Sequence, residues 1–273
     1  MNKKRIGIIC VNFESCHELL NYIESINDAV KNELRVCVDV YIADNSVNEI
    51  CQINTNSYKS INVCVYAFKK NLGYLGGVYS VMSKVGIDKF HQYDYLIISN
   101  VDLVLSENFF SELLKVNIKN DVGWIAPKII SQKEGCDRNP KILKRPNKKH
   151  INYLLVLFYF PVLYMVYRKF IYSRKKQKAN NENVSDIYAG HGSIMIFTRR
   201  FIQNNVVFEY DSFLFGEELY IAEMIRLYKM RVIYCPNVLV YDIDHVSTGK
   251  INLKKYCMMN YESLKLIKNK YYI

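Results

Sequence analysis

Residues 93–102, YDYLIISNVD, and residues 4–13, KRIGIICVNF, each join a run of apolar and β-branched residues to a polar cluster. Short apolar runs that end in polar residues are typical of strands buried on both faces, as in the parallel sheets of α/β proteins. The two segments therefore predict strands over 4–11 and 93–99, each with polar side chains at its carboxyl end.

The rest of the first half repeats this pattern, with strand-like runs alternating with helix-like segments. It predicts further strands over 35–43, 61–67 and 122–130, and helices over 16–32, 75–88 and 107–117. Such alternation is typical of βαβ units. The predicted fold class is α/β, with a mostly parallel central sheet flanked by helices. A length of 273 residues is compatible with one large domain or two smaller ones.

Polar clusters follow four of these strands. They are Val11-Asn12-Phe13-Glu14, Asp44-Asn45-Ser46, Asn71 to Gly77, and Asn100-Val101-Asp102. Ligands of open α/β sheets bind at the carboxyl ends of the strands, so we expect these clusters to converge on one edge. The glycines at 73, 76 and 77 do not fit G-x-G-x-x-G, which argues against a dinucleotide fingerprint.

The alternation stops after Ile130. Residues 131–185 are polar and basic around one apolar run, and the pattern resumes with a strand over 186–197, a helix over 216–229, a strand over 231–235 and a helix over about 252–269. We therefore divide the chain into a first half, 1–130, a basic and partly apolar insertion, 131–185, and a second half, 186–273.

The positive charge is concentrated in the insertion. The chain has 37 Lys and Arg against 26 Asp and Glu, and half of its residues are hydrophobic, with 23 Tyr and 13 Phe. Disordered chains are polar and poor in aromatic residues, so this composition excludes disorder. Twelve basic residues and no acidic residue lie between Arg138 and Lys178. This local charge favours an anionic partner and argues against a general nucleic-acid coat.

Eight cysteines are spread along the chain without a C-x-x-C pair. Cys10, Cys37, Cys64 and Cys235 lie in apolar strand-like runs, which favours buried reduced thiols over disulfides or a zinc site. The amino terminus leads directly into the first strand, without the cleavage site of a secretory signal. A cytoplasmic location is therefore expected.

Seven short motifs follow one another in a characteristic order. They are Val11-Asn12-Phe13, Ala43-Asp44-Asn45-Ser46, Asn71 to Gly77, Ser99-Asn100-Val101-Asp102, Gly190-His191-Gly192-Ser193, Phe215-Gly216-Glu217-Glu218 and Asp244-His245. Through them the chain resembles the glycosyltransferase family 2 proteins of GT-A fold, in particular the rhamnosyltransferase-like branch that builds bacterial surface polysaccharides. The resemblance covers about residues 4–130 and 186–250. It implies that the first half binds a nucleotide sugar and that the second half binds the acceptor and carries the catalytic residues.

The resemblance implies a divalent cation, Mg²⁺ or Mn²⁺, beside the donor diphosphate. Asp102 matches the last residue of the family's D-x-D position and would be the metal-side carboxylate, because both ions prefer carboxylate oxygens. The first position is Asn100 here, so a clamp of two carboxylates is not implied. His245 matches a position that in many relatives contacts the metal or the diphosphate. From the residues alone, the alternatives are that Asp102 is a helix cap or turn residue and that His245 is a structural residue.

Further donor-binding residues implied by the resemblance are Phe13, Asp44, Asn45, Asn71, Gly73, Gly77 and Asn100. Asp44 matches the acidic residue that hydrogen-bonds the base or ribose, and Phe13 matches an aromatic residue near the base. Gly73 and Gly77 would let the backbone pass close to the donor, with Asn71 positioning it. An Asx turn at Asp44 and a tight turn at Gly73 are the alternatives from the residues alone.

An inverting transfer needs a base that deprotonates the acceptor hydroxyl. In the family this base is a carboxylate of an acidic pair before a helix, which implies Glu218, with Glu217 positioning the acceptor or exchanging that role. His191 and Gly192 match positions that contact the acceptor. The alternatives are two glutamates that complement a helix dipole and a solvated histidine.

The apolar run Ile151 to Tyr167 has 17 uncharged residues, is interrupted by Pro161 and is rich in Tyr. A spanning helix needs about 20 apolar residues, so the run is better suited to lying in a membrane interface. Lys148 and Lys149 before it, and the basic residues from Arg168 to Lys176 after it, would meet anionic headgroups. The alternative is a core helix flanked by solvated lysines.

The leading hypothesis is an inverting glycosyltransferase that moves a sugar from a UDP- or dTDP-sugar to a glycan or lipid-linked acceptor, at the inner face of the plasma membrane. A nucleotidyltransferase is an alternative, but residues 11–14 lack the Gly-rich, basic signature expected after its first strand. A non-catalytic nucleic-acid-binding protein that uses residues 138–178 is another, although no nucleic-acid partner is expected.

Overall fold

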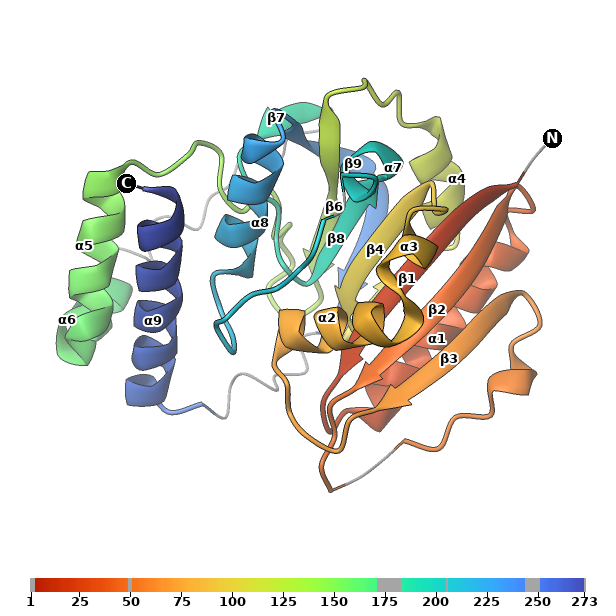
Figure 1. Ribbon diagram of the computed structural model, residues 1–273, viewed down its shortest axis with the longest axis horizontal. Helices are drawn as coiled ribbons and strands as arrows, with labels where there is room; N and C mark the ends of the chain where they lie inside the picture. The colour runs from red at the N-terminus through yellow and green to blue at the C-terminus, as the bar shows by residue number, and fades with distance from the viewer. Residues whose placement is uncertain (1–2, 49–50, 171–182, 205, 244–250, 273) are drawn as a thin grey trace.

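A single mixed β-sheet forms the centre of the computed structural model, in the order β3-β2-β1-β4-β8-β6-β9-β5, with β7 paired to β9 (Figure 1). The structure describes residues 3–48, 51–170, 183–204, 206–243 and 251–272. The strands are β1 (Lys4–Asn12), β2 (Val36–Asp44), β3 (Ile61–Ala67), β4 (Tyr95–Asn100), β5 (Leu103–Leu105), β6 (Val122–Ser131), β7 (Ser185–Ile187), β8 (Ile194–Thr198) and β9 (Arg231–Asp242). The α/β class predicted from the sequence is confirmed.

The helices connect these strands and cover both faces of the sheet. They are α1 (Cys16–Lys31), the short 3-10 helix η1 (Thr55–Ser57), α2 (Tyr74–Val85), α3 (Ile87–Phe90), α4 (Phe109–Lys115), α5 (Lys148–Tyr159), α6 (Pro161–Phe170), α7 (Arg199–Ile202), α8 (Glu217–Leu227) and α9 (Leu253–Tyr271). The helix predicted over 75–88 is divided at Gly86, whose φ of 93° lies outside the range of helical residues.

The sheet is parallel in its first half and mixed in its second. Strands β3, β2, β1 and β4 are parallel, whereas β8 is antiparallel to both β4 and β6. After the insertion the chain first pairs with the beginning of β9 through β7. It then crosses to the carboxyl end of β4, where Ile194 lies opposite Ser99, so β8 runs in the opposite direction. The strand predicted over 186–197 is accordingly two strands, β7 and β8, separated by a turn at residues 188–193.

Two hydrophobic cores lie on opposite faces of the sheet, because side chains alternate along each strand. On β1, Ile6, Ile8 and Cys10 pack with α1 and α4, whereas Ile9 faces the core under α2 and α8. All four side chains are fully buried. This packing fixes the carboxyl ends of the strands relative to the first turns of α2 and α8.

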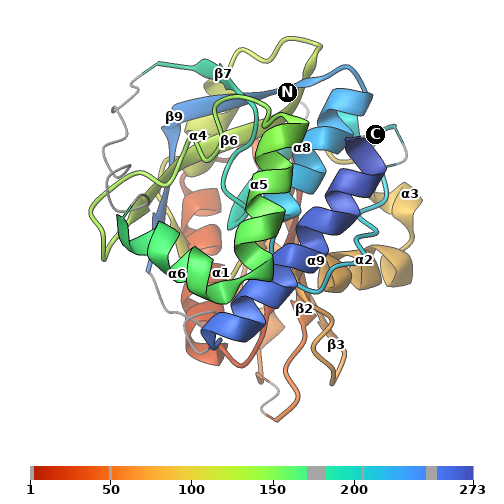
Figure 2. The same cartoon turned by 90° about the vertical axis from the view of Figure 1, so that its left-hand side faces the viewer.

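The apolar run of the insertion forms two helices instead of one. Together α5 and α6 have the length and composition of a membrane span, but they are bent by 110° at the break before Pro161; among the described residues no single helix meets that test. Figures 1 and 2 show α5, α6 and α9 together at the end of the molecule opposite β3. Ile151 and Leu157 of α5 are buried, so one face of the predicted interfacial segment belongs to the core.

A buried ion pair anchors the insertion to the second half. Glu223 of α8 is fully buried and accepts hydrogen bonds from Arg145 Nε at 2.7 Å and Arg226 Nε at 2.7 Å. Arg145 also donates to the carbonyl of Tyr271 at the end of α9. The part of the insertion over residues 131–170 is therefore packed on the folded body. The basic residues predicted at Arg174, Lys175, Lys176 and Lys178 lie outside the described residues.

The prediction of reduced, buried thiols is wrong for several cysteines. Cys16 and Cys51 form a disulfide that joins the start of α1 to the loop after β2. Cys37 and Cys64 are exposed, because each side chain points away from the core on a strand near the edge of the sheet. Cys10 and Cys235 are buried free thiols, as predicted.

Candidate active site

The carboxyl ends of three parallel strands bring the predicted polar clusters together. Asn12 lies opposite Asp44 in the register of β1 and β2, and Val11 lies opposite Asn100 in that of β1 and β4. Asn12, Asp44 and Asn45 are each only 1% exposed. Polar side chains are buried at this depth only where hydrogen bonds or a ligand satisfy them. The convergence expected from the sequence is thus found at one edge of the sheet.

Asp44 is held rigidly, with one oxygen left available. Its Oδ1 accepts from Asn12 Nδ2 at 3.0 Å and from the backbone N–H of Ser46 at 3.1 Å. Its Oδ2 is buried and has no hydrogen-bond partner among the described residues, and the same is true of the Oδ1 atoms of Asn12 and Asn45. An Asx turn is therefore present, and it leaves three acceptor oxygens that a donor-bearing ligand would satisfy. Phe13, 39% exposed, lies at the same edge.

The turn before α2 is tied to this cluster. Asn45 Nδ2 donates to the carbonyl of Gly73 at 2.9 Å, and Asn71 Oδ1 accepts from the N–H of Gly73 at 3.0 Å. Gly73 has a φ of 75°, and a Cβ there would lie 2.1 Å from a carbonyl oxygen, so only glycine fits. A Cβ at Gly77 would lie tightly against Asn45, Val11 and Ala43. Glycine at this position therefore allows α2 to pack closely on the sheet.

Asp102 lies just past β4, in a cluster of three charged groups. Its Oδ1 is buried and has no hydrogen-bond partner among the described residues. Burial, and after it the nearby carboxylate of Asp242, raise the pKa of Asp102 to about 6, while Arg138 opposes the shift. Arg138 Nε lies 3.2 Å from Asp242 Oδ2. A carboxylate that is buried without a partner costs stability, which is typical of a binding site for a cation.

The residues present fit a divalent cation. Magnesium is commonly held by one or two carboxylates together with substrate phosphates, and the free Oδ1 of Asp102 supplies such a ligand. Among the described residues, no group of three or more His, Cys, Asp or Glu side chains could hold a metal by itself. His245 lies outside the described residues, so its predicted contact with the metal stays a prediction.

The acidic pair occupies the first turn of α8. The chain enters this helix through Phe215 and Gly216, with φ values of 71° and 78°. A φ above zero is costly for phenylalanine, and the hydroxyls of Tyr210 and Ser263 hold the conformation by donating to its carbonyl. Burial first, and then the neighbouring carboxylate of Glu218, raise the pKa of Glu217 to about 8. Glu217 is therefore protonated at neutral pH.

The turn at residues 190–193 connects the polar cluster at the strand ends to the acidic pair. The carbonyl of Ser193 accepts from the N–H of Asn100 at 2.8 Å, and the N–H of Gly192 donates to Glu218 Oε1 at 3.4 Å. A Cβ at Gly192 would lie 3.3 Å from the Glu218 carboxyl group, so the glycine makes room for that side chain. His191 Nδ1 lies 3.0 Å from Ser193 Oγ, and the ring is therefore oriented by the turn.

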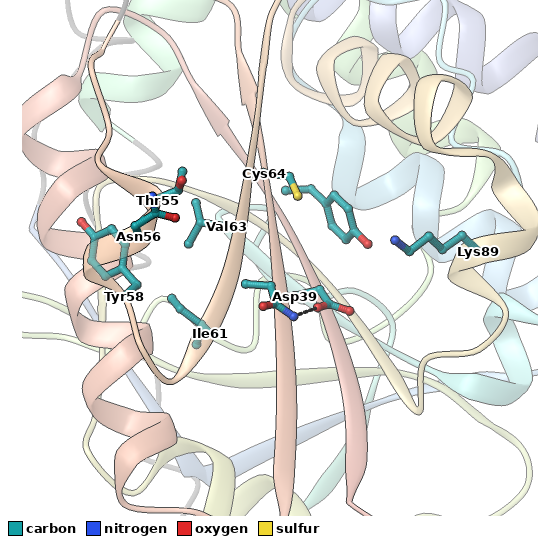
Figure 3. A pocket seen from close by; sticks show the side chains of 10 residues that line it. Asp39, Thr55, Asn56, Tyr58, Ile61, Val63, Cys64 and Lys89 are labelled. Carbon is teal, nitrogen blue, oxygen red and sulfur yellow. Dashed lines mark hydrogen bonds between the residues drawn. The ribbon is translucent and has the colours of Figure 1, made fainter.

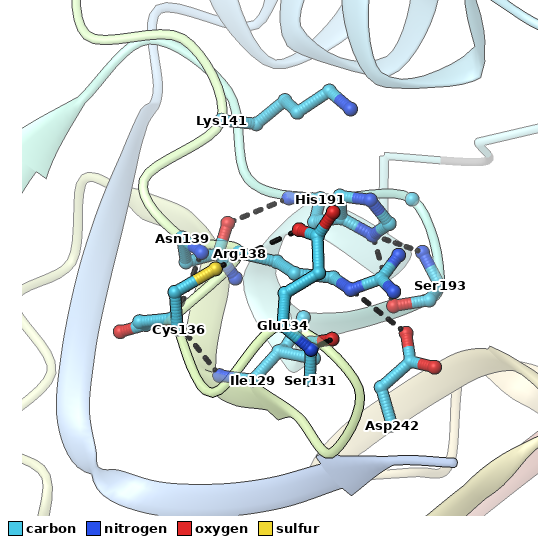
Figure 4. Close-up of polar contacts among 12 residues, drawn as sticks. Ile129, Ser131, Glu134, Cys136, Arg138, Asn139, Lys141, His191, Ser193 and Asp242 are labelled. Atoms are coloured by element: carbon cyan, nitrogen blue, oxygen red, sulfur yellow. Dashed lines mark hydrogen bonds and ion pairs between the residues drawn. The ribbon is translucent and has the colours of Figure 1, made fainter. Parts of the chain in front are cut away.

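A segment of the insertion, residues 137–142, crosses the site; we call it the strap. Figure 4 shows Arg138 reaching from it toward Asp242, and Lys141 on the far side of His191. Lys141 Nζ lies 4.0 Å from Glu218 Oε1. The backbone of Ile142 exchanges two hydrogen bonds with Ala189, which ties the strap to the turn. Two cations of the basic segment thus face the carboxylates of the site.

Four further residues of the site were not predicted from the sequence: Tyr74, Arg138, Lys141 and Asp242. The Tyr74 hydroxyl is buried at the first turn of α2 without a hydrogen-bond partner among the described residues. Burial, and after it the charges of Glu217, Glu218 and Asp102, raise the pKa of Tyr74 well above its ordinary range. Tyr74 therefore lies close to Asp102 as well as to the acidic pair.

A separate hollow lies at the outer edge of the sheet, around β3. It is an open pocket with a volume of about 530 Å³, lined by residues that include Asp39, Tyr41, Asn62, Cys64 and Lys89 (Figure 3). These residues belong to the body of β2 and β3 and to α3, away from the carboxyl ends of the strands. None of the predicted site residues lines it.

Comparison with known proteins shows the fold. No family model and no curated protein sequence matches the chain. Among solved structures, GalNAc-T7 with UDP, GalNAc and Mn²⁺ matches 98% of this chain and 50% of its own, with a TM-score of 0.59 and 14% identity. The mannosyltransferase PcManGT from Pyrobaculum calidifontis, in complex with GDP-Man and Mn²⁺, matches 100% and 63%, with a TM-score of 0.53 and 10% identity. S. aureus TarS matches 97% and 39%, with a TM-score of 0.57 and 12% identity. The fold is that of GT-A type glycosyltransferases. The chain spans between 39% and 63% of the length of these three proteins.

Proposed function

We propose that the protein is an inverting glycosyltransferase that takes its sugar from a nucleoside-diphosphate donor. The main support is one edge of the sheet that combines buried, unsatisfied oxygens at Asp44 and Asp102 with the acidic pair at the start of α8. Asp44 would accept from an N–H of the base or from the ribose. Asp102 would hold the cation of the donor diphosphate. Mn²⁺ is present in two of the similar structures.

The transfer would proceed by attack of an acceptor hydroxyl on the anomeric carbon. The new C–O bond forms on one face while the bond to the phosphate oxygen breaks on the other, and the electron pair leaves with the diphosphate. Glu218 receives the hydroxyl proton, because its partner Glu217 is already protonated at neutral pH. A cation bound at Asp102 supplies Lewis-acid stabilisation of the departing diphosphate.

The donor requirement is testable by nucleotide release. We expect release of UDP, dTDP or GDP from at least one of a panel of hexosyl and rhamnosyl donors, with Mn²⁺ or Mg²⁺ present, and an increase of at least about tenfold on addition of a lipid-linked glycan acceptor. EDTA should abolish the release. Absence of release from every donor, with both cations and several acceptors, would contradict the proposal, whereas pyrophosphate release from a nucleoside triphosphate would indicate a nucleotidyltransferase.

We further propose that the acceptor belongs to cell-surface polysaccharide assembly and is held at an anionic membrane. The α5–α6 face carries the exposed apolar side chains of Tyr153, Val156, Tyr159, Phe160, Val162, Leu163, Met165 and Val166. Lys148 and Lys149 lie at the start of α5, and Arg168 and Lys169 at the end of α6. An apolar surface bordered by cations matches the interface of an anionic bilayer. Such lipids are abundant on the cytoplasmic leaflet, where we propose the protein acts.

Co-sedimentation with vesicles tests this face. The double variant Val162→Glu/Val166→Glu places two charges one turn apart on exposed positions of α6, so we expect its bound fraction on phosphatidylglycerol vesicles to fall at least fivefold. Leu34→Glu adds a charge at an exposed apolar position elsewhere and should bind as the wild type does. Binding should also weaken on neutral phosphatidylcholine vesicles. Equal sedimentation of the double variant and the wild type would contradict this proposal.

A further inference from the structure

Hydrogen bonds hold the backbone of the strap on both sides of Arg138. Asp137 Oδ1 accepts from the N–H of Ile129 at 3.0 Å and from that of Asn139 at 2.9 Å, and Tyr234 donates to its Oδ2. The N–H of Arg138 donates to the carbonyl of Ile129 at 2.8 Å. The backbone of the strap is therefore held against β6 and β9.

The residue after Arg138 fixes the strap to the turn below it. Asn139 is 2% exposed; its Nδ2 donates to the carbonyl of Pro127 at 2.7 Å, and its Oδ1 accepts from the N–H of His191 at 2.7 Å. The backbone on both sides of Arg138 is held by hydrogen bonds, and Asn139 is buried. The side chain of Arg138 points toward the carboxyl edge, where Figure 4 shows it beside Asp242. This is the preorganisation that ligand-binding arginines require.

The side chain of Arg138 is suited to an anionic ligand. Arg138 Nε lies 3.2 Å from Oδ2 of the buried Asp242, and the guanidinium is close enough to Asp102 to interact with it electrostatically. A guanidinium has five N–H donors in a planar fork, and this fork matches phosphate oxygens as well as carboxylates. A donor diphosphate bound beside Asp102 would lie within its reach.

From this geometry we propose that Arg138, a residue of the insertion, binds the diphosphate of the donor and offsets the charge that the diphosphate gains as the sugar leaves. The inference rests on the proposed function and adds a specific anchor for the leaving group. In the free protein the guanidinium is paired with Asp242, and in the donor complex it is shared between Asp242 and the diphosphate. The basic segment would then bind the donor diphosphate in addition to the proposed membrane surface.

Calorimetric titration with UDP, dTDP and GDP, and with their monophosphates, tests the contact, in EDTA and again with Mn²⁺. For the nucleotide that the wild type prefers, Arg138→Gln should weaken diphosphate binding by about tenfold to hundredfold and change monophosphate binding by less than about threefold. Arg138→Lys should recover part of the affinity. Lys144→Gln, which removes an exposed cation from the same segment, should bind both nucleotides as the wild type does.

A purely structural role for Arg138 predicts different results. If Arg138 serves only to neutralise Asp242, the double variant Arg138→Gln/Asp242→Asn will restore diphosphate binding, and that result overturns the inference. Unchanged diphosphate binding by Arg138→Gln, or equal loss for both nucleotides, also overturns it while the proposed function stands. Failure of the wild type to bind any of the three diphosphates would overturn the proposed function as well.

Discussion

Asp102→Asn is expected to lower donor-dependent nucleotide release by about 10²-fold to 10³-fold while making the folded protein more stable. The loss of activity follows because the variant lacks the carboxylate that would hold the cation, whose stabilisation of a departing diphosphate is on the order of 3 to 4 kcal/mol. The loss of activity is measured from initial rates of nucleotide release with Mn²⁺, at saturating donor and acceptor. Glu107→Gln, an exposed acidic residue five positions further along, should retain full activity and is the matched control.

The gain in stability follows from the pKa of Asp102, which burial raises to about 6. An acid with a raised pKa contributes stability that is fully present below its unfolded-state pKa and is lost as the pH rises through the folded-state pKa. In EDTA, the melting temperature of Asp102→Asn should therefore equal that of the wild type near pH 4 and exceed it by roughly 5 °C at pH 7.5, a difference of about 2 kcal/mol. A variant less stable than the wild type at pH 7.5 would show that Asp102 is a structural residue.

The polar cluster at the carboxyl ends of β1, β2 and β4 could be predicted from the sequence because its signals are local. Asn12, Asp44 and Asn100 each end an apolar run, and parallel strands place such ends side by side whatever the rest of the chain does. Gly73 could be predicted to be part of a turn for the same reason. The buried oxygens that now distinguish a ligand site from an Asx turn depend on packing, and no local pattern shows them.

The cations of the site could not be predicted in the same way. Arg138 and Lys141 belong to a run of basic residues whose composition indicates only an anionic partner. Their contacts with Asp242 and Glu218 depend on how the insertion returns to the sheet, which is a tertiary feature. The disulfide between Cys16 and Cys51 was missed for the same reason, because only the folded chain brings the loop after β2 against α1.

The apolar run of the insertion was half predictable. Pro161 is a local signal for a helix break, and the structure bends there, which argues against a straight spanning helix. The burial of Ile151 and Leu157 against α9 could not be read from a run that is apolar on every side, because no periodicity distinguishes its two faces.

Glu218→Gln is expected to lower the rate of sugar transfer by about 10²-fold to 10⁴-fold without changing donor affinity. The neutral amide keeps the shape of the side chain and cannot accept the proton of the acceptor hydroxyl, and general-base catalysis contributes a factor of this size. The rate should be measured at saturating donor, and donor affinity by calorimetry. Glu217→Gln is the matched control, one position earlier on α8, and should lose less than about tenfold because Glu217 is already protonated at neutral pH.

The two variants also decide which member of the pair is the base. Burial and Glu218 hold the pKa of Glu217 at about 8, so its proton is lost only above neutral pH, and the repulsion that follows destabilises the first turn of α8. The melting temperature of Glu217→Gln should therefore exceed that of the wild type by more at pH 9 than at pH 6. If Glu217→Gln instead abolishes transfer and Glu218→Gln retains it, the roles of the two carboxyl groups are exchanged.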